Sequence, residues 1–419
     1  MKHATLTIVN GKSQQFSAAD AGDISLSLNK NLQHQLPIYQ AQGTVAGSLP
    51  EADPQPAAQT QLPATPKEVT ATWLSSVLGT SIRSIELTKI QHGTASKLFY
   101  TVTYDDDSHA AEQRPTQLCL KGGFDPALVQ KMPWVTSIYQ REVEFFKQIA
   151  PTLDHMSLPR GWWAGSDSKQ GIVVLDDLGV QGCTFGDPRA VWPVSRVLAG
   201  VEQLAALHAA TWGAPQADYP GFQTGAGAVT DTVVLTLMQT FDAVVRGPDR
   251  PPVPAYLQDQ ARITAALEKH YAIRNPAFRC LLHGDARTGN TYLDAGSAPR
   301  FLDWQMIHVG SAFHDVAYFI GGALSVEDRR AHEWDIVDHY LDTLRKLGGP
   351  VLSSRREDVA NEYRKSFLAG HGWIMCPYEM QPRECVYAMA ARYAAALDDH
   401  KTLELVESLP DIKQDLQTS

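Results

Sequence analysis

The stretch CLLHGDARTGNTYLDAGSAPRFLDWQ, residues 280–305, carries the most information about the fold of this 419-residue chain. Within it, the segments 290–293 and 299–302 have strand character and flank an Asp-Ala-Gly-Ser turn, which predicts a β-hairpin. A hairpin at this place would bring together three polar side chains that are separated in the sequence. These are Asp285, Asn290 and Asp303.

Two carboxylates and an amide in this order are suited to phosphoryl transfer. The reaction needs a group that aligns the attacking hydroxyl and accepts its proton, and a divalent cation that offsets the phosphate charge. Asp285 would orient or deprotonate the hydroxyl, while Asn290 and Asp303 would offer hard oxygen ligands to Mg²⁺. Any one of the three, taken alone, is explained as well by capping a turn or ending a strand. Their common order around one hairpin favours the functional interpretation.

The spacing His-Gly-Asp, four residues, Asn, and then Asp303 resembles the catalytic loop and the metal-binding aspartate of protein kinases. The glycine after His283 and the tryptophan after Asp303 look like the aminoglycoside phosphotransferase and choline kinase branch. Residues 175–179 and 392–397 are most similar to the ecdysteroid kinase-like members. The resemblance implies that Asp285 is the catalytic base, that Asn290 and Asp303 hold Mg²⁺, that His283 anchors the loop and that the phosphoryl donor is ATP.

The order of predicted elements separates a small mixed lobe from a helical one. Alternating apolar and β-branched residues predict strands at 82–90, 92–104, 117–121 and 171–175. Helical periodicity predicts helices at 65–78, 139–149, 194–212, 331–347, 355–369 and 382–399. We therefore expect an α+β, bilobal, protein-kinase-like fold, with a small antiparallel-sheet N-lobe and a larger, mainly helical C-lobe.

A kinase of this kind needs a strand lysine, a carboxylate on the next helix and a loop over the phosphates. Lys121 ends an apolar strand and is the candidate for the α- and β-phosphates. Glu142 is the candidate for its partner; Glu144 points about 200° further round the helix. Gly93 and Ser96 lie in a loop between two predicted strands and could reach a phosphate oxygen, although an ordinary hairpin turn explains them equally well.

The strand that ends in Leu-Asp-Asp-Leu-Gly resembles the hinge of these phosphotransferases, where backbone groups bind adenine. On this resemblance Val174, Asp176 and Leu178 would line the adenine pocket. Two further residues also resemble family positions: His208 is expected to be a hydrogen-bonded structural residue, and Asp315 an anchor for the catalytic loop.

The composition of the chain argues against several kinds of partner and bears on its cellular location. The formal net charge of -10 argues against a nucleic-acid partner. The five cysteines are odd in number and scattered, which indicates neither a disulfide framework nor a zinc site. No apolar run is long enough to span a bilayer. We expect a cytoplasmic protein without a membrane partner.

The expected domains are an extension with a proline-rich linker at 1–64, an N-lobe with the hinge at 65–179, and a C-lobe at 180–419. The expected acceptor is a small molecule with a hydroxyl, bound near the aromatic segment 371–380. A protein kinase and a pseudokinase with the same fold are the alternatives. The sequence leaves open the acceptor, the choice of ATP or GTP, and the oligomeric state.

Overall fold

The computed structural model describes residues 61–410 except 106–113, 220, 223–232, 235–236, 273–274 and 295. Nearly all of the extension and linker predicted at 1–64 lies outside the described residues. Gln61 and the residues that follow it form one compact unit. Among the helices described, none has the length and apolar character needed to cross a membrane.

The small lobe is built on a five-stranded antiparallel sheet with the strand order β1-β2-β3-β5-β4. Its strands are β1 (Ile82–Gln91), β2 (Ser96–Tyr104), β3 (Gln117–Gly122), β4 (Gly161–Ser166) and β5 (Gly171–Asp176). Strand β4 was not predicted, and β2 begins four residues later than expected because residues 92–95 form the connecting loop.

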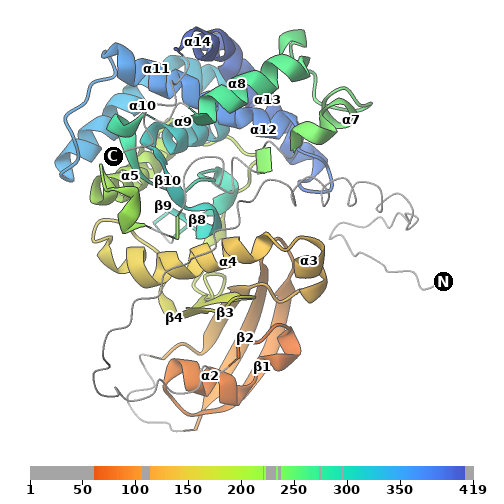
Figure 1. The fold of residues 1–419 in the computed structure, drawn as a ribbon. Helices are drawn as coiled ribbons and strands as arrows, with labels where there is room; N and C mark the ends of the chain where they lie inside the picture. Colours follow the sequence, from red (N-terminus) through yellow and green to blue (C-terminus); the bar gives the residue numbers. More distant parts are fainter. Residues whose placement is uncertain are drawn as a thin grey trace, which may run out of the picture. The chain divides into compact units, whose positions relative to one another are not determined.

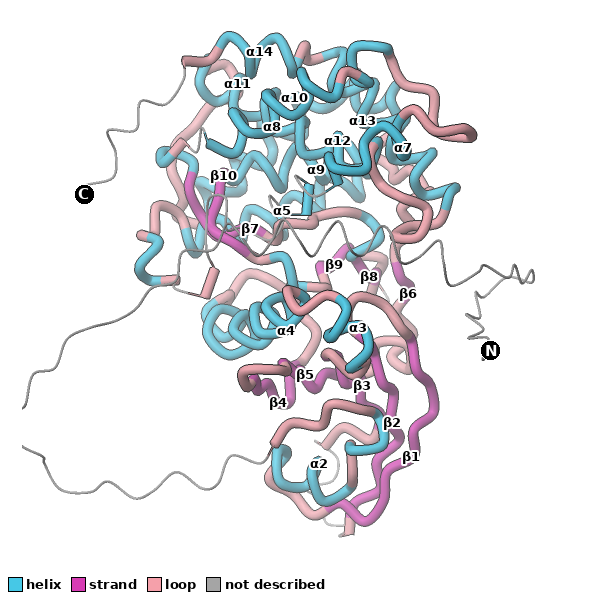
Figure 2. Tube along the Cα trace, turned by 45° about the vertical axis from the view of Figure 1, so that its right-hand side comes forward, coloured by secondary structure: helices cyan, strands magenta, loops and turns pink. Residues whose placement is uncertain are grey.

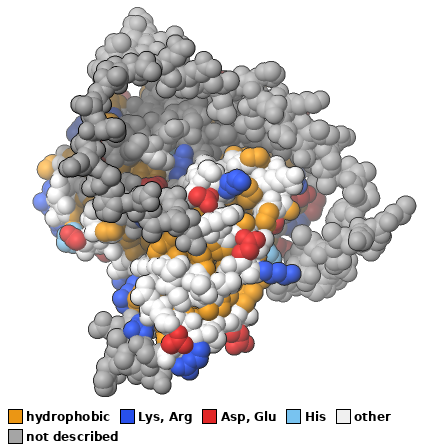
Figure 3. Space-filling view, turned by 60° about the horizontal axis from the view of Figure 1, so that its bottom comes forward, with side chains coloured by type: hydrophobic (Ala, Val, Ile, Leu, Met, Phe, Trp, Pro, Cys, Tyr) orange, Lys and Arg blue, Asp and Glu red, His pale blue; other side chains and the backbone are white. Residues whose placement is uncertain are grey.

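Charged side chains of both signs are scattered over the described surface seen in Figure 3.

One face of this sheet packs on helix α2 (Ala71–Leu78) and buries a cluster that includes Trp73, Leu118 and Leu120. The predicted helix at 65–78 begins later than expected, because the Thr70 hydroxyl accepts a hydrogen bond from the Trp73 N–H and caps α2. The helix ends at Gly79, which has a left-handed conformation.

The other face of the sheet packs on helix α4 (Val135–Glu144), which follows the short helix α3 (Pro126–Lys131). Figure 1 shows α4 lying between the sheet and the strands β8 and β9 of the larger lobe. The helix predicted at 139–149 begins four residues earlier than expected. Its last part, Phe145–Ile149, has the wider π-helical winding. This position makes α4 the contact between the two lobes.

The larger lobe is mainly helical, and one extended apolar core joins its helices. The helices are α5 (Val194–Thr211), α7 (Phe241–Val245), α8 (Gln260–Ala272), α9 (Ala312–Ala323), α10 (Val326–Lys346), α11 (Glu357–Ser366), α12 (His371–Ile374), α13 (Arg383–Asp399) and α14 (Thr402–Ser408). The expected α+β fold, with an antiparallel-sheet lobe and a helical lobe, is confirmed.

Two small sheets hold the segment that the sequence singled out. The predicted hairpin is present as β8 (Thr291–Leu293) and β9 (Pro299–Phe301), and β6 (Thr184–Phe185) pairs with its outer edge. Strand β7 (Arg279–Leu282) pairs with β10 (His308–Ser311). Figure 2 shows β8 and β9 near α4, as in Figure 1, and places β10 farther into the larger lobe. The loop between β7 and β8 contains Asp285 and Asn290, and Asp303 directly follows the hairpin.

Candidate functional site

The loop after β7 is held from behind by a buried carboxylate on α9. The N–H groups of His283 and Gly284 donate to the two oxygens of Asp315, at 2.6 and 3.0 Å. The His283 ring lies with Nε2 3.0 Å from the Leu302 carbonyl oxygen, which ties the loop to the end of the hairpin. Gly284 has φ +82°, and a Cβ atom there would lie 2.2 Å from the Met306 carbonyl oxygen. Only glycine fits this position.

Asp315 is itself fixed by partners that cannot easily move. His208 Nε2 lies 3.3 Å from its Oδ2, and the other ring nitrogen of His208 lies 2.9 Å from the Tyr340 hydroxyl. Burial alone would raise the pKa of Asp315, but its hydrogen bond to His208 and nearby histidine charge lower that pKa to about 2. These contacts are the ones expected of a loop anchor and of a hydrogen-bonded structural histidine.

Asp285 and Asn290 are joined directly. The Asn290 Nδ2 donates to the Asp285 carboxylate at 2.7 Å and to the Asp285 backbone oxygen at 3.0 Å. Because the amide nitrogen makes these bonds, the amide oxygen of Asn290 points elsewhere and is the atom that a cation would use. The Asp285 side chain is 26% exposed, so it is accessible to a reactant.

Arg287 lies beside this pair and was missed by the sequence analysis. Its Nε donates to Asp285 Oδ2 at 3.2 Å. Burial opposes the charge of Arg287, but Asp285 outweighs burial and raises its pKa, so the guanidinium stays charged beside Asp285. The sequence did contain a signal, because Arg287 is the single cationic residue between Asp285 and Asn290.

Asp303 connects the two lobes. Its Oδ1 lies 2.6 Å from the ammonium group of Lys121 on β3. Burial alone would raise the pKa of Asp303, but the charges of Lys121 and Lys97 outweigh it and lower that pKa to about 2. The Asp303 backbone is left-handed, with φ +71°, a conformation that is uncommon for residues other than glycine. The adjacent Leu302 N–H donates to the Asn290 carbonyl at 3.0 Å, which places Asp303 next to the loop of Asp285.

Lys121 also pairs with Glu142 on α4. Its Nζ lies 2.8 Å from Glu142 Oε1 and 2.7 Å from Oε2, and both side chains are about 95% buried. Burial lowers the pKa of Lys121, but Asp303 and Glu142 raise it by more, so the ammonium group is retained. Burial and the charge of Asp303 raise the pKa of Glu142, although Lys121 opposes them. Glu142 Oε1 also accepts the Trp304 N–H at 3.2 Å, which links α4 to the residue after Asp303.

Residues 92–95, which include Gly93, join β1 to β2, and Ser96, predicted in this loop, is instead the first residue of β2. Ser96 is buried, and its Oγ lies 3.4 Å from the His92 Nδ1. The Tyr139 hydroxyl on α4 donates to the Thr94 carbonyl at 2.6 Å and holds the loop against the helix. Lys97, the next residue, lies opposite Lys121 in the β2–β3 register, so both lysines are on one face of the sheet. The sequence analysis did not identify Lys97.

The hinge residues lie at the end of β5, beside β3. The Val174 side chain is buried in the cluster under α2, on the face away from Lys121, so only its backbone could contribute to an adenine pocket. Val173 and Leu175 lie opposite Lys121 and Cys119 in the register and share their face. Lys121 therefore has three apolar neighbours on its face of the sheet, which are Val173, Leu175 and Cys119. None of the three was identified from the sequence.

The polar groups near the hinge make local bonds. Asp176 accepts from Trp162 Nε1 at 2.6 Å and from Gln181 Nε2 at 2.9 Å, and the Leu178 carbonyl accepts from the Cys183 N–H at 3.2 Å. Asp285 and Asn290 form one hydrogen-bonded pair, and Lys121, Glu142 and Asp303 form a second bonded group; the Leu302 N–H, next to Asp303, donates to the Asn290 carbonyl and links the two. The loop candidates lie at the connection of β1 to β2 and the hinge candidates at the end of β5, and β3 separates β2 from β5 in the sheet.

The aromatic segment 371–380, which was expected to bind the acceptor, is partly buried and partly exposed. His371, Trp373 and Met375 are buried, whereas Met380 is exposed. Of the buried group, the Trp373 ring lies 5.6 Å from the Arg287 guanidinium, and its Nε1 donates to the Tyr318 hydroxyl at 2.8 Å. This part of the segment is next to Asp285.

The side-chain donors near the site limit the kind of metal ion that could bind there. Within the described residues, no group of three or more His, Cys, Asp or Glu side chains could hold a metal ion. One carboxylate and one amide oxygen, from Asp303 and Asn290, fit a different kind of site, because Mg²⁺ commonly binds one or two protein oxygens and takes phosphate and water for the rest.

Comparisons with known proteins identify a family. The ecdysteroid kinase-like family matches residues 95–348. A search of curated proteins finds no match. Among solved structures, the macrolide 2'-phosphotransferase MphH from Brachybacterium faecium is 16% identical, with a TM-score of 0.40, over 81% of this chain and 97% of its own.

Two choline kinases are similar to the same extent. The enzyme LicA from Streptococcus pneumoniae is 12% identical, with a TM-score of 0.41, over 76% of this chain and 97% of its own. The choline kinase from Cryptosporidium parvum Iowa II is 11% identical, with a TM-score of 0.44, over 82% of this chain and 94% of its own.

Proposed function

Because this chain belongs to the ecdysteroid kinase-like family, we propose that it is an ATP-dependent small-molecule kinase, which transfers the γ-phosphoryl group to a hydroxyl of a metabolite. The observation that carries this proposal is the network across the two lobes. Lys121 of the sheet lobe contacts Glu142 and Asp303 at once, and Asp303 is adjacent to the bonded pair of Asp285 and Asn290.

Asp285 is proposed to act as the general base. Its carboxylate is partly exposed and is held by the Asn290 amide and by Arg287, which fix its direction without covering it. A base in this position accepts the proton of the attacking hydroxyl as the new P–O bond forms. Arg287 lies beside Asp285, where its positive charge would favour an anionic phosphoryl group.

Asn290 and Asp303 are proposed to hold Mg²⁺ together with the phosphates of the nucleotide. When bound, the ion would offset negative charge on the phosphates during transfer. The low pKa of Asp303 suits this role, because the carboxylate is ionised at all physiological pH values. Lys121 would exchange part of its contact with Asp303 for the α- and β-phosphates, while Glu142 keeps it in place.

The segment after Asp303 favours a small acceptor over a protein. Only residues 304–311, which include the short strand β10, separate Asp303 from helix α9. This segment pairs with β7 and leaves no long loop that could serve as a platform for a peptide. The acceptor is therefore proposed to enter between the catalytic loop and the helices of the larger lobe.

The proposal is tested by ATP turnover with Mg²⁺ and a pool of hydroxylated metabolites. Replacing Asp285 with Asn should lower phosphoryl transfer by about 10²- to 10⁴-fold, because the base is lost while its shape is kept. Asp335→Asn is the matched control, since Asp335 is exposed on α10 of the same lobe. Equal rates in all three proteins would remove Asp285 from catalysis. Labelling of proteins and not of metabolites would identify a protein kinase, and no turnover at all would favour a pseudokinase.

A further inference from the structure

Lys97 lies on the same face of the small sheet as Lys121. In strand β2, Leu98 and Tyr100 belong to the apolar cluster under α2, so Lys97 points to the opposite face. On that face it lies directly opposite Lys121 in the β2–β3 register. Side chains paired in this way have Cβ atoms about 4.5–5.5 Å apart. Lys97 is therefore within side-chain reach of the groups that Lys121 contacts.

The charged side chains already placed in the candidate site are paired with one another. Lys121 Nζ lies 2.6 Å from Asp303 Oδ1 and 2.7 Å from Glu142 Oε2. Arg287 Nε lies 3.2 Å from Asp285 Oδ2. In this set the three carboxylates outnumber the two cations, which is unfavourable for a bound polyphosphate. A further cation is needed to offset this charge.

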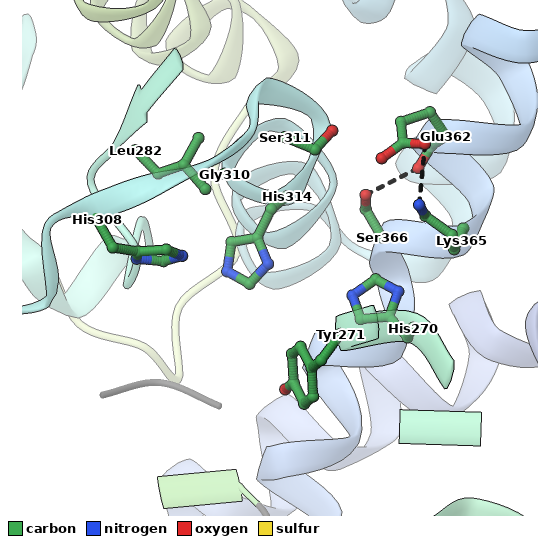
Figure 4. A pocket seen from close by; sticks show the side chains of 10 residues that line it. All are labelled: His270, Tyr271, Leu282, His308, Gly310, Ser311, His314, Glu362, Lys365 and Ser366. Carbon is green, nitrogen blue, oxygen red and sulfur yellow. Dashed lines mark hydrogen bonds and ion pairs between the residues drawn. The ribbon is translucent and has the colours of Figure 1, made fainter. Parts of the chain in front are cut away.

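Lys97 is a cation without such a partner. Within the part of the chain that the structure describes, its ammonium group makes no hydrogen bond or ion pair, although the side chain is partly buried. The buried lysines Lys121 and Lys365 differ, because each contacts a carboxylate. Figure 4 shows this for Lys365, which lines a small cavity in the larger lobe and lies 2.9 Å from Glu362 Oε2. The ammonium group of Lys97 is thus available to an incoming anion.

The position of Lys97 also fits the proposed place of the phosphates. It follows Ser96, the first residue after the connection of β1 to β2. Burial raises the pKa of Asp303, and the charge of Lys121 and then that of Lys97 lower it, in agreement with the register. Like charges directly opposite each other on two strands are unfavourable. An anion between Lys97 and Lys121 would remove this repulsion.

We infer that Lys97 is a second phosphate-binding lysine, which contacts a phosphate group of the nucleotide directly and without a metal ion between them. The inference rests on the proposed kinase function and adds a residue to its nucleotide site. Lys121 can donate to a phosphate only by giving up part of its contact with a carboxylate, whereas Lys97 gives up none.

Isothermal titration calorimetry in EDTA, without Mg²⁺, tests the inference with ADP and adenosine as probes. Lys97→Met should weaken ADP binding by about 10- to 100-fold, because a charge-assisted hydrogen bond is lost, and should leave adenosine binding unchanged. Lys97→Arg keeps the charge and should bind ADP nearly as well as the natural protein.

Lys67→Met is the matched control, because it removes the same charge from the other face of the sheet. Lys67 is exposed and follows Pro66, whose carbonyl oxygen accepts a hydrogen bond from the Tyr100 hydroxyl on the α2 side. This variant should bind ADP like the natural protein. Thermal unfolding without ligand checks that the variants are folded, and Lys97→Met should be at least as stable as the natural protein, since the repulsion from Lys121 is relieved.

Equal ADP affinity in the natural protein and in Lys97→Met would overturn the inference. An equal loss of adenosine binding would overturn it too, because Lys97 would then support only the shape of the pocket, and so would ADP binding that requires Mg²⁺. The two proposals fail separately. Turnover that depends on Asp285 but not on Lys97 would leave the kinase function standing, whereas Lys97-dependent ADP binding without any turnover would keep the inference and favour a pseudokinase.

Discussion

An aspartate whose pKa is lowered to about 2 lies on each side of the loop between β7 and β8, but the partners differ. On the core side, Asp315 is held by two backbone N–H groups and by His208. On the cleft side, Asp303 is held by Lys121, whose flexible side chain belongs to the other lobe. The first set of partners belongs to the packed larger lobe, whereas the second is the one that we propose is exchanged for a cation or a phosphate. A low pKa therefore does not distinguish anchor from reactive group; the kind of partner does.

The largest expected effect is on the rate of phosphoryl transfer, which should distinguish Asp303 from Asp315. Asp303→Asn should lower Mg²⁺-dependent phosphoryl transfer by about 10³-fold or more, because an amide neutralises the proposed metal ligand that supplies several kcal/mol of charge stabilisation. Its free energy of unfolding at neutral pH should fall by no more than about 2 kcal/mol, the contribution of the lowered Asp303 pKa, since Lys121 keeps its bonds to Glu142. Steady-state kinetics and thermal unfolding of the same sample measure both. A large loss of stability with normal activity per folded molecule would make Asp303 an anchor like Asp315.

The next effect is on stability. Asp315→Ala should lower the free energy of unfolding by about 3–5 kcal/mol, because it leaves the His283 and Gly284 N–H groups and His208 buried without their acceptor. Asp335→Ala, at an exposed position on α10, should change it by less than about 0.5 kcal/mol. Urea unfolding followed by far-UV circular dichroism measures this difference. If the two variants were equally stable, the anchor assignment would be wrong.

The smallest expected effect is the response to acid. A carboxylate whose pKa is lower in the folded state stabilises the protein above the unfolded pKa and loses that contribution as the pH falls through the folded one. For Asp303 the window runs from 3.8 down to about 2. Between pH 5 and pH 2, Asp303→Asn should therefore lose up to about 2 kcal/mol less stability than the natural protein. Urea titrations at several pH values test this, and identical losses in both proteins would show that Lys121 does not stabilise the Asp303 carboxylate.

The quoted stretch allowed a detailed prediction because its signals are local. The hairpin followed from a turn between two short strands, and Asp285, Asn290 and Asp303 were chosen from motif spacing. Outside this stretch, Lys121 was chosen as the last residue of an apolar strand, and Glu142 from the family resemblance. The structure joins these five in one network. Their assigned roles in catalysis and in binding ATP and Mg²⁺ remain proposals.

Other parts could not be predicted because their patterns are weak or depend on distant contacts. Strand β4 contains two tryptophans and two glycines, without clear alternation, and it is defined by pairing with β5. Strands β7 and β10 are each four residues long and come from opposite sides of the hairpin. Lys97 could be identified as a neighbour of Lys121 only from the register of the two strands. The side chain of Val174 faces away from Lys121, which strand alternation could have shown once the register was known.

The sequence alone predicted the fold class, the hairpin and a set of candidate residues for phosphoryl transfer, because periodicity, turn residues and motif spacing are properties of neighbouring positions. Only the tertiary structure decided that Lys121 reaches Asp303 across the lobes, that Asp315 holds the loop from behind, and that Lys97 lies opposite Lys121 without a carboxylate partner among the described residues. These facts depend on packing between segments tens to hundreds of residues apart, and burial there sets both the pKa of a carboxylate and the cost of an unpaired atom.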